Sequence, residues 1–144
     1  MNKKKLLEYI NKYTYCRLGS SKIHGIGVLA IRDIPKGTDI FVGSFLGKTF
    51  EYKKSDFAWL HPNIKQMLYD YLVPEKSVFS IPVCGLNGID ISYFLNHSED
   101  PNVISNDNCD TFIALRDIKE AEELTYLYTK EKKDLISFIS QKEE

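Results

Sequence analysis

Short apolar segments, each closely followed by turn-forming residues, constrain the fold of this chain most strongly. Gly27 to Ile31 and Ile40 to Leu46 are apolar and β-like, and Ile34-Pro35-Lys36-Gly37 lies between them. Because Pro presets φ and Gly tolerates positive φ, this tetrapeptide predicts a tight turn. Strands separated by such short turns form small antiparallel sheets. The sequence therefore predicts a mainly β fold with short helices.

Helical spacing interrupts this β pattern in three places. Apolar residues recur at helical intervals between residues 51 and 72, and His61-Pro62 divides this insert into two pieces. Residues 3 to 13 have a weaker helical period. One apolar side among charged residues predicts a terminal helix from about Lys130 to Gln141. Further strands are expected at residues 78–83, 89–95, 111–115 and 123–128.

The chain contains one internal echo. The segment AIRDIPK at residues 30–36 resembles ALRDIK at residues 114–119. A duplicated hairpin fits this similarity, and so do two strand–turn units that converge on the same chemistry. The echo therefore predicts no repeat architecture.

Composition indicates one soluble domain. The 144 residues are 43% hydrophobic and 27% charged, and the formal net charge is −1. This balance produces no global positive field that would draw the chain to nucleic acid or to an anionic membrane. No apolar stretch approaches the roughly 20 residues of a membrane-spanning helix. Polar residues interrupt the segment after Lys3 to Lys5, so no secretory signal is expected.

The number and spacing of the cysteines indicate the redox state of the compartment. Cys16, Cys84 and Cys109 are widely spaced and odd in number. Such spacing argues against a disulfide framework and against a zinc site with paired cysteine ligands. The sequence therefore predicts a reducing intracellular compartment, either the cytoplasm or the nucleus.

Three polar segments can carry chemistry, and the first is His24-Gly25-Ile26-Gly27. Its two glycines let a ligand or another strand approach the backbone closely. The segment lacks the third glycine and the following helix of a dinucleotide-binding fingerprint. A plain β-turn is the alternative interpretation.

The second polar segment is Asn96-His97-Ser98. Asn and His supply amide donors, an amide acceptor and an imidazole, which can hold a heteroaromatic ring and a charged group. His97 and Ser98 point to opposite faces of an extended chain, which argues against a nucleophile–base pair. No second His or Cys lies at the spacing of a metal site. A turn with a hydrogen-bonded histidine is the alternative.

The third polar segment is Glu123 to Tyr128. With a period of two, Tyr126 and Tyr128 share one face of the predicted strand. Paired phenols on one face can line a narrow aromatic slot. An ordinary cross-strand aromatic pair is the alternative.

Taken together and in this order, these segments resemble the SET domain from about Cys16 to Tyr128. Four elements carry the resemblance: the His24 to Val28 entry, the Arg32 to Gly37 turn, NHSEDPN at Asn96 to Asn102, and LRDIKEAEELTYLY at Leu115 to Tyr128. The resemblance implies a β-clip-like fold of several small antiparallel sheets, with a knot-like C-terminal threading and a C-terminal helix. It implies three parts: an N-terminal extension at 1–14, a SET domain at 15–128, and a helix or lid at 129–144.

The resemblance also implies an activity. SET domains transfer a methyl group from S-adenosylmethionine to the side-chain amine of a lysine in a protein substrate, as in histone modification, and need no metal. By resemblance, the residues expected to bind S-adenosylmethionine are His24, Gly25, Ile26, Gly27, Asn96, His97 and Tyr128. The expected catalytic residues are Tyr128 and Tyr126, and the expected channel residues are Tyr126 and Tyr71, with Tyr69 as the alternative to Tyr71.

Physical chemistry agrees with this assignment. A lysine with a pKa near 10.4 must lose its proton before it attacks a methyl group. A narrow, poorly solvated aromatic channel disfavours the ammonium form and lowers that pKa. Tyr126 stands where the family carries Phe or Tyr, and the extra hydroxyl predicts mainly monomethylation. Glu99, Ala121 and Leu127 depart from the family's usual Cys, Gly and Asp, and no cysteine-rich segment follows Tyr128.

The expected partner is a protein substrate with a basic tail, a histone or another basic protein, and neither nucleic acid nor a membrane is expected to bind directly. Small relatives use a homodimer to complete the substrate groove, and this chain can do the same. A SET-like binding module without activity, and a β-rich interaction domain with coincidental motifs, are the alternatives. The presence of Asn96, His97 and Tyr128 favours the enzyme.

Overall fold

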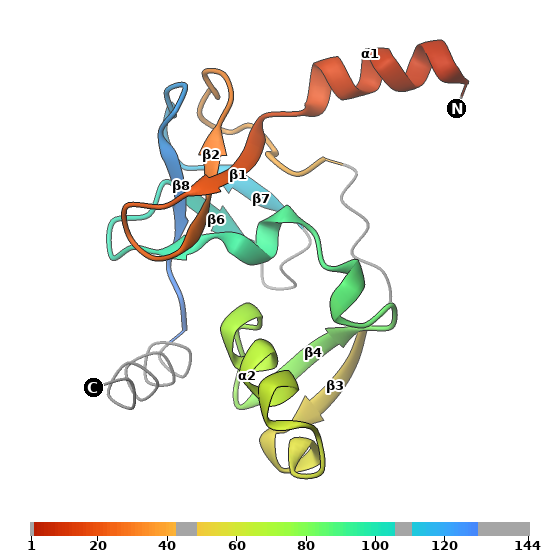
Figure 1. Cartoon of the computed structure of the whole chain (residues 1–144). Coiled ribbons are helices and arrows are strands. Elements are labelled where there is room, and N and C mark those ends of the chain that lie inside the picture. The colour runs from red at the N-terminus through yellow and green to blue at the C-terminus, as the bar shows by residue number, and fades with distance from the viewer. Residues whose placement is uncertain (1, 43–48, 106–110, 130–144) are drawn as a thin grey trace. The chain divides into compact units, whose positions relative to one another are not determined.

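The computed structural model describes residues 2–42, 49–105 and 111–129. The chain divides into two compact units, shown in Figure 1. The first unit comprises Met1–Ser44 and Phe94–Leu127, and the second comprises Phe45–Tyr93 and Tyr128–Glu144. The second unit contains the segment that helical spacing marked as an insert. Among the described residues, no helix has the length and apolar character needed to cross a membrane.

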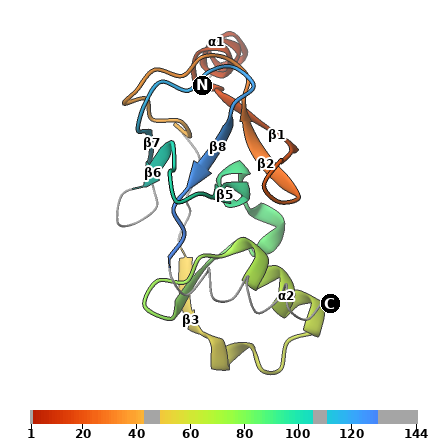
Figure 2. The same cartoon turned by 90° about the vertical axis from the view of Figure 1, so that its left-hand side faces the viewer.

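A four-stranded sheet in the first unit joins segments that are far apart in the sequence. Its order is β1 (Cys16–Ser20), β2 (Ile26–Ala30), β8 (Glu123–Tyr126) and β5 (Asn96–His97). Neighbouring strands pair antiparallel except β5 and β8, which are parallel. Figure 2 shows β5 beside β8. The sheet therefore places the Asn-His segment next to the Glu-Leu-Thr-Tyr segment.

A second antiparallel pair completes the first unit. Strands β6 (Val103–Ser105) and β7 (Phe112–Ala114) pair with Ile104 opposite Ile113. The core of the unit is mainly aliphatic, and the ring of Phe112 is also buried in it. Its most deeply buried large side chains are Val28, Ile34, Ile40, Val103, Ile118 and Leu124.

The two echoed segments pair with each other through reciprocal hydrogen bonds. Ile34 and Ile118 exchange backbone hydrogen bonds of 2.8 and 2.9 Å. The carboxylate of Asp117 accepts from the N–H of Lys36 at 2.8 Å, and that of Asp33 accepts from the N–H of Glu120 at 2.9 Å. The echo is therefore a pair of equivalent turns that cap each other.

Helix α1 (Lys3–Tyr13) precedes the sheet. The side chain of Asn2 caps its first turn by accepting from the N–H of Lys5. At its other end, the guanidinium of Arg32 donates to the carbonyls of Asn11 and Lys12 and lies over the ring of Tyr15. A cation at this position suits the negative end of the helix dipole. The helical period predicted for residues 3 to 13 is confirmed.

The second unit has its own aromatic core. It contains β3 (Thr49–Lys53), a 3-10 helix (Lys54–Phe57), α2 (Pro62–Tyr71), β4 (Val78–Pro82) and a 3-10 turn (Leu86–Gly88). The rings of Phe57 and Phe79 meet edge to face, with centroids 5.3 Å apart. Leu68 and Leu72 complete the buried cluster.

Several predicted elements are confirmed. Strand β4 matches the strand predicted at 78–83, and β7 matches the one at 111–115. The break predicted at His61-Pro62 is also correct, because α2 begins at Pro62. Proline suits the first helical position, where the helix leaves the backbone N–H unpaired.

Other predictions are wrong. Residues 40–42 form a turn where a strand was predicted, and residues 51–53 belong to β3 and pair with β4 instead of continuing a helical insert. A 3-10 helix (Ile91–Phe94) replaces the apolar strand predicted at 89–95, and β8 ends at Tyr126. These segments are apolar, but a short apolar run does not specify the backbone conformation. The helix predicted at 130–141 and Cys109 lie outside the described residues.

Candidate functional site

The loop between β1 and β2 is held by its own hydrogen bonds. The N–H of Ser21 donates to the carbonyl of Gly25 at 2.9 Å, and Gly25 has a φ of 48°. The hydroxyl oxygen of Ser21 accepts from the N–H groups of Ile23 and His24 at 2.9 and 3.1 Å. This loop carries the first predicted cofactor residues, and Ser21 fixes its shape.

Asn96 of β5 ties the sheet to this loop. Its amide nitrogen lies 3.0 Å from the carbonyl oxygen of His24, 3.2 Å from that of Ile26 and 2.9 Å from Oε1 of Glu123. Three oxygen neighbours identify this atom as the donor of the amide. Asn96 is buried, with 8% of its surface exposed. The structure therefore brings Asn96 onto the His24–Gly27 segment, although about 70 residues separate them in the sequence.

Glu123 of β8 completes this arrangement. Its Oε1 also accepts from the hydroxyl of Ser21 at 2.7 Å, and its Oε2 lies 2.9 Å from the same hydroxyl. We call the side chains of Ser21, Asn96 and Glu123 the carboxylate clamp. A Cβ at Gly27 would lie 2.3 Å from Oε1 of Glu123, whereas a Cβ at Gly25 would meet nothing within 4 Å. The second glycine thus makes room for the clamp, and the first provides a turn that is open on its outer side.

His97 and Tyr126 lie opposite each other on β5 and β8. The imidazole Nε2 of His97 lies 3.1 Å from a carboxylate oxygen of Glu99. The hydroxyl of Tyr126 forms a 2.9 Å hydrogen bond with the hydroxyl of Ser105, and its ring packs edge to face on Phe112. The phenol of Tyr126 therefore has a fixed position.

The other predicted tyrosines belong to the second unit. Tyr71 is the last residue of α2, and Tyr128 lies beyond the end of β8. Tyr69 packs against Phe57 and Phe79, and its burial raises the pKa of its phenol. Tyr69 therefore serves the aromatic core.

Asn102, the last residue of the NHSEDPN segment, supports β8 from behind the site. It is almost fully buried, and its side chain accepts from the N–H of Thr125 at 2.8 Å and donates to the carbonyl of Glu123 at 2.9 Å. It also reaches Glu122, whose pKa is lowered mainly by the guanidinium of Arg116. These contacts fix the strand that carries the clamp.

Sequence reasoning missed several of these residues. Glu123 and Asn102 stand inside the motifs that were singled out, so the motifs themselves could have drawn attention to both. Ser21 and Ser105 have no motif of their own. Their importance depends on contacts across 102 and 21 residues of sequence, respectively.

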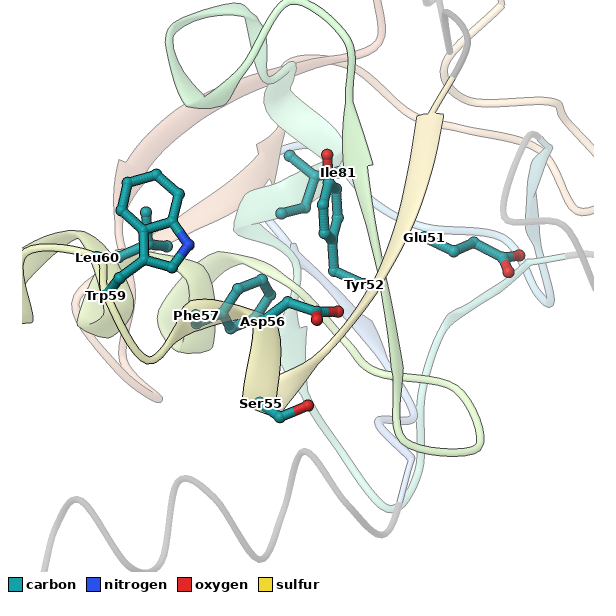
Figure 3. A pocket seen from close by; sticks show the side chains of 8 residues that line it. All are labelled: Glu51, Tyr52, Ser55, Asp56, Phe57, Trp59, Leu60 and Ile81. Atoms are coloured by element: carbon teal, nitrogen blue, oxygen red, sulfur yellow. The ribbon is translucent and has the colours of Figure 1, made fainter.

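The second unit contains a separate open pocket of about 770 Å³. Figure 3 shows aromatic side chains that reach it from β3 and from the segment before α2, among them Tyr52, Phe57 and Trp59. None of the predicted cofactor or channel residues lines it. Within residues 2–42, 49–105 and 111–129, no group of three His, Cys, Asp or Glu side chains is arranged to hold a metal ion.

The chain belongs to the SET-domain family, because the SET domain model matches residues 25–129. A variant-silencing SET domain-containing protein of Plasmodium falciparum is 34% identical over 113 residues, which cover 73% of this chain and 4% of that protein. The chain thus spans a small part of the length of the curated relative it matches.

Solved structures share the fold at low sequence identity. A candidate histone methyltransferase of Plasmodium falciparum is 20% identical, with a TM-score of 0.51, over 81% of this chain and 95% of that one. A humanized mutant of the Polycomb Repressive Complex 2 of Chaetomium thermophilum, bound to an inhibitor, is 20% identical, with a TM-score of 0.50, over 80% of this chain and 15% of that one. The complex ctPRC2, autoinhibited and bound to S-adenosylmethionine, is 18% identical, with a TM-score of 0.53, over 90% of this chain and 17% of that one. The predicted β-rich SET fold of small sheets is therefore confirmed, while the knot-like threading stays a prediction.

Proposed function

We propose that this chain is an S-adenosylmethionine-dependent methyltransferase that acts on a lysine side chain of a basic protein, such as a histone. The observation that carries the proposal is the bonding of Asn96 to the carbonyls of His24 and Ile26. It joins two motifs that sequence reasoning assigned to one cofactor. Family membership and a structural neighbour bound to S-adenosylmethionine support the same assignment.

The residues present suit this cofactor. Gly25 leaves the outer side of the loop open, so a ligand can approach the backbone there. The chain itself uses the amide nitrogen of Asn96, and we therefore assign its amide oxygen to the positively charged amino group of the ligand. His97 and the backbone of residues 24–27 are the other proposed contacts. When bound, the cofactor supplies an electrophilic methyl group on a sulfonium.

Two tyrosines are proposed to handle the lysine. Transfer requires a neutral amine in line with the methyl group, so positioning accounts for much of the rate. We assign the orientation of the amine to Tyr128 by motif resemblance. The hydroxyl of Tyr126 is held by Ser105, and we propose that this fixed group limits the space for added methyl groups. Mainly monomethylation is the expected result.

The first test is transfer of radiolabelled methyl from S-adenosylmethionine to core histones and to a basic-protein extract. Wild type should label a discrete band, and Tyr128→Phe should lose at least about tenfold of the rate, because loss of one well-placed group costs that much or more. Mass spectrometry of the product should show mainly monomethyl-lysine in wild type and more dimethyl-lysine in Tyr126→Phe. Tyr52→Phe removes a hydroxyl from β3 and serves as the control.

A SET-like binding module without activity is the second candidate. It predicts calorimetric binding of S-adenosylmethionine without methyl transfer to any basic protein. Absence of cofactor binding in the wild-type protein would contradict both candidates. The homodimer and the cytoplasmic or nuclear location stay proposals, which analytical ultracentrifugation and imaging of the tagged protein can test.

A further inference from the structure

We propose that Glu123 and Ser21 are positioning residues for cofactor binding. Through the carboxylate clamp they hold the His24–Gly27 loop in the shape that accepts S-adenosylmethionine. The inference rests on the proposed function and deepens it, because neither residue belongs to the predicted cofactor contacts.

Bond geometry gives Glu123 the central place in the clamp. Its Oε1 accepts from the hydroxyl of Ser21 and from the amide of Asn96, so one oxygen receives donors from the loop after β1 and from β5 at once. Each of these donors then acts on the loop. Ser21 accepts from the N–H groups of Ile23 and His24, and Asn96 donates to carbonyls of His24 and Ile26. The N–H and the C=O of His24 are therefore both held by groups that are bonded to the same carboxylate.

A carboxylate suits this position because it only accepts hydrogen bonds. Both neighbours present hydrogens to it, and no donor of its own competes. Bonds to an ionised acceptor are also shorter and stronger than bonds between neutral groups. A glutamine would keep one acceptor oxygen but would lose the charge. The clamp should therefore weaken by degrees from Glu through Gln to Ala at position 123.

Gly27 provides an independent geometric argument. The space that a Cβ would need there is filled by the carboxylate of Glu123 and by Cβ of Ser21, which lies 3.1 Å away. The backbone of β2 approaches the clamp so closely that only glycine fits while the clamp is closed. Gly27 and Glu123 thus form one packing unit.

The experiment compares wild type with Ser21→Ala, Glu123→Gln and Glu123→Ala by calorimetric titration with S-adenosylmethionine. Loss of hydrogen bonds that order the loop should raise the Kd roughly tenfold in Ser21→Ala and Glu123→Ala, with Glu123→Gln in between. In steady-state assays the KM for S-adenosylmethionine should rise by a similar factor. The kcat at saturating cofactor should change about twofold or less, since the clamp does not touch the reacting atoms.

Matched controls are Ser20→Ala and Glu120→Gln, which change exposed side chains close to Ser21 and Glu123 in the sequence. Both should bind the cofactor like wild type. Circular dichroism and thermal unfolding show whether each variant folds. If Glu123→Ala does not fold, Ser21→Ala, the mildest change, carries the test. Faster amide exchange at Ile23 and His24 in Ser21→Ala would report the opened loop directly.

The outcomes separate the two proposals. An unchanged Kd in folded Ser21→Ala and Glu123→Ala, with wild type active, overturns the positioning role and leaves the methyltransferase intact. Wild type that binds no S-adenosylmethionine overturns both. A raised Kd in Ser21→Ala and Glu123→Ala, together with an unchanged Kd in Glu120→Gln, supports the positioning role of the clamp.

Discussion

At the scale of single residues, Ala121 occupies a backbone conformation that favours glycine. Its φ is 69°, and Gly37, its counterpart in the other echoed turn, has a φ of 83°. The two residues make equivalent hydrogen bonds, since the N–H of Gly37 donates to the carbonyl of Ala114 and the N–H of Ala121 to that of Ala30, each at 2.8 Å. Ala121, which stands where the family usually has glycine, therefore carries a conformational cost.

We expect Ala121→Gly to stabilise the protein by about 0.5 to 1 kcal/mol, because it relieves a left-handed conformation that costs about that much for a residue with a Cβ. Gly37→Ala should destabilise by a similar or larger amount. Urea unfolding of both variants measures the two changes. A loss of stability in Ala121→Gly would show that the entropy of the unfolded glycine chain outweighs the strain.

The two glycines of the loop show how far the sequence could predict the site. Their spacing indicated a close approach of another group to the backbone, and at Gly27 that group is the carboxylate of Glu123. The sequence could not identify the group, because Glu123 lies about 100 residues away and nothing in the local pattern links it to Ser21. Neighbouring residues in the sequence determine local conformation, whereas contacts across the sheet depend on the whole fold.

At the scale of elements, the two echoed turns form a reciprocal pair. Residues 30–38 and 114–122 exchange equivalent backbone bonds, and each turn's aspartate caps the other. The similarity of the two segments is evident from the sequence, but only the pairing shows that both form the same kind of turn. The insert shows the opposite case, because helical spacing was predicted for Glu51 to Lys53 and these residues belong to β3. Its backbone follows its partner β4 and overrides the apolar spacing.

The turn that ends at Glu122 should make stability depend on acid pH. The hydrogen bond from Arg116 is the largest cause that lowers the pKa of Glu122 below its ordinary value of 4.5, followed in the same direction by the N–H of Lys119. A carboxyl whose pKa is lower in the folded state stabilises the protein above the unfolded pKa, and this contribution is lost as pH falls through the folded pKa.

Glu122→Gln should therefore cost about 0.5 to 1 kcal/mol at pH 7, as expected for a partly exposed ion pair with added hydrogen bonds. The cost should shrink as the pH is lowered from 5 toward 3. Urea unfolding of wild type and Glu122→Gln at pH 7, 5 and 3 measures this convergence, with exposed Glu120→Gln as the control. A constant difference across the series would contradict the assigned cause.

At the scale of the whole molecule, the chain divides into two compact units. Length and hydrophobic fraction determine how much core a chain can form, but not how that core is divided between parts of the chain. Here the first unit has a mainly aliphatic core and the second has an aromatic core. The family resemblance was carried by motifs between His24 and Tyr128, and the SET domain model matches residues 25–129. The boundaries at residues 14 and 128 stay predictions.

This division predicts where the cofactor should stabilise the protein. The clamp and the His24–Gly27 loop lie in the first unit, so hydrogen exchange with S-adenosylmethionine bound should slow at residues 21–27 and 96–97. A ligand at 100 times its Kd that binds only the folded state adds about 2.7 kcal/mol, which raises the Tm by several degrees. At the same ligand concentration, Glu123→Ala should show a smaller rise and Glu120→Gln the same rise as wild type. Slowed exchange confined to the aromatic core of the second unit would place the cofactor elsewhere, and the functional assignment of the glycine loop would then be wrong.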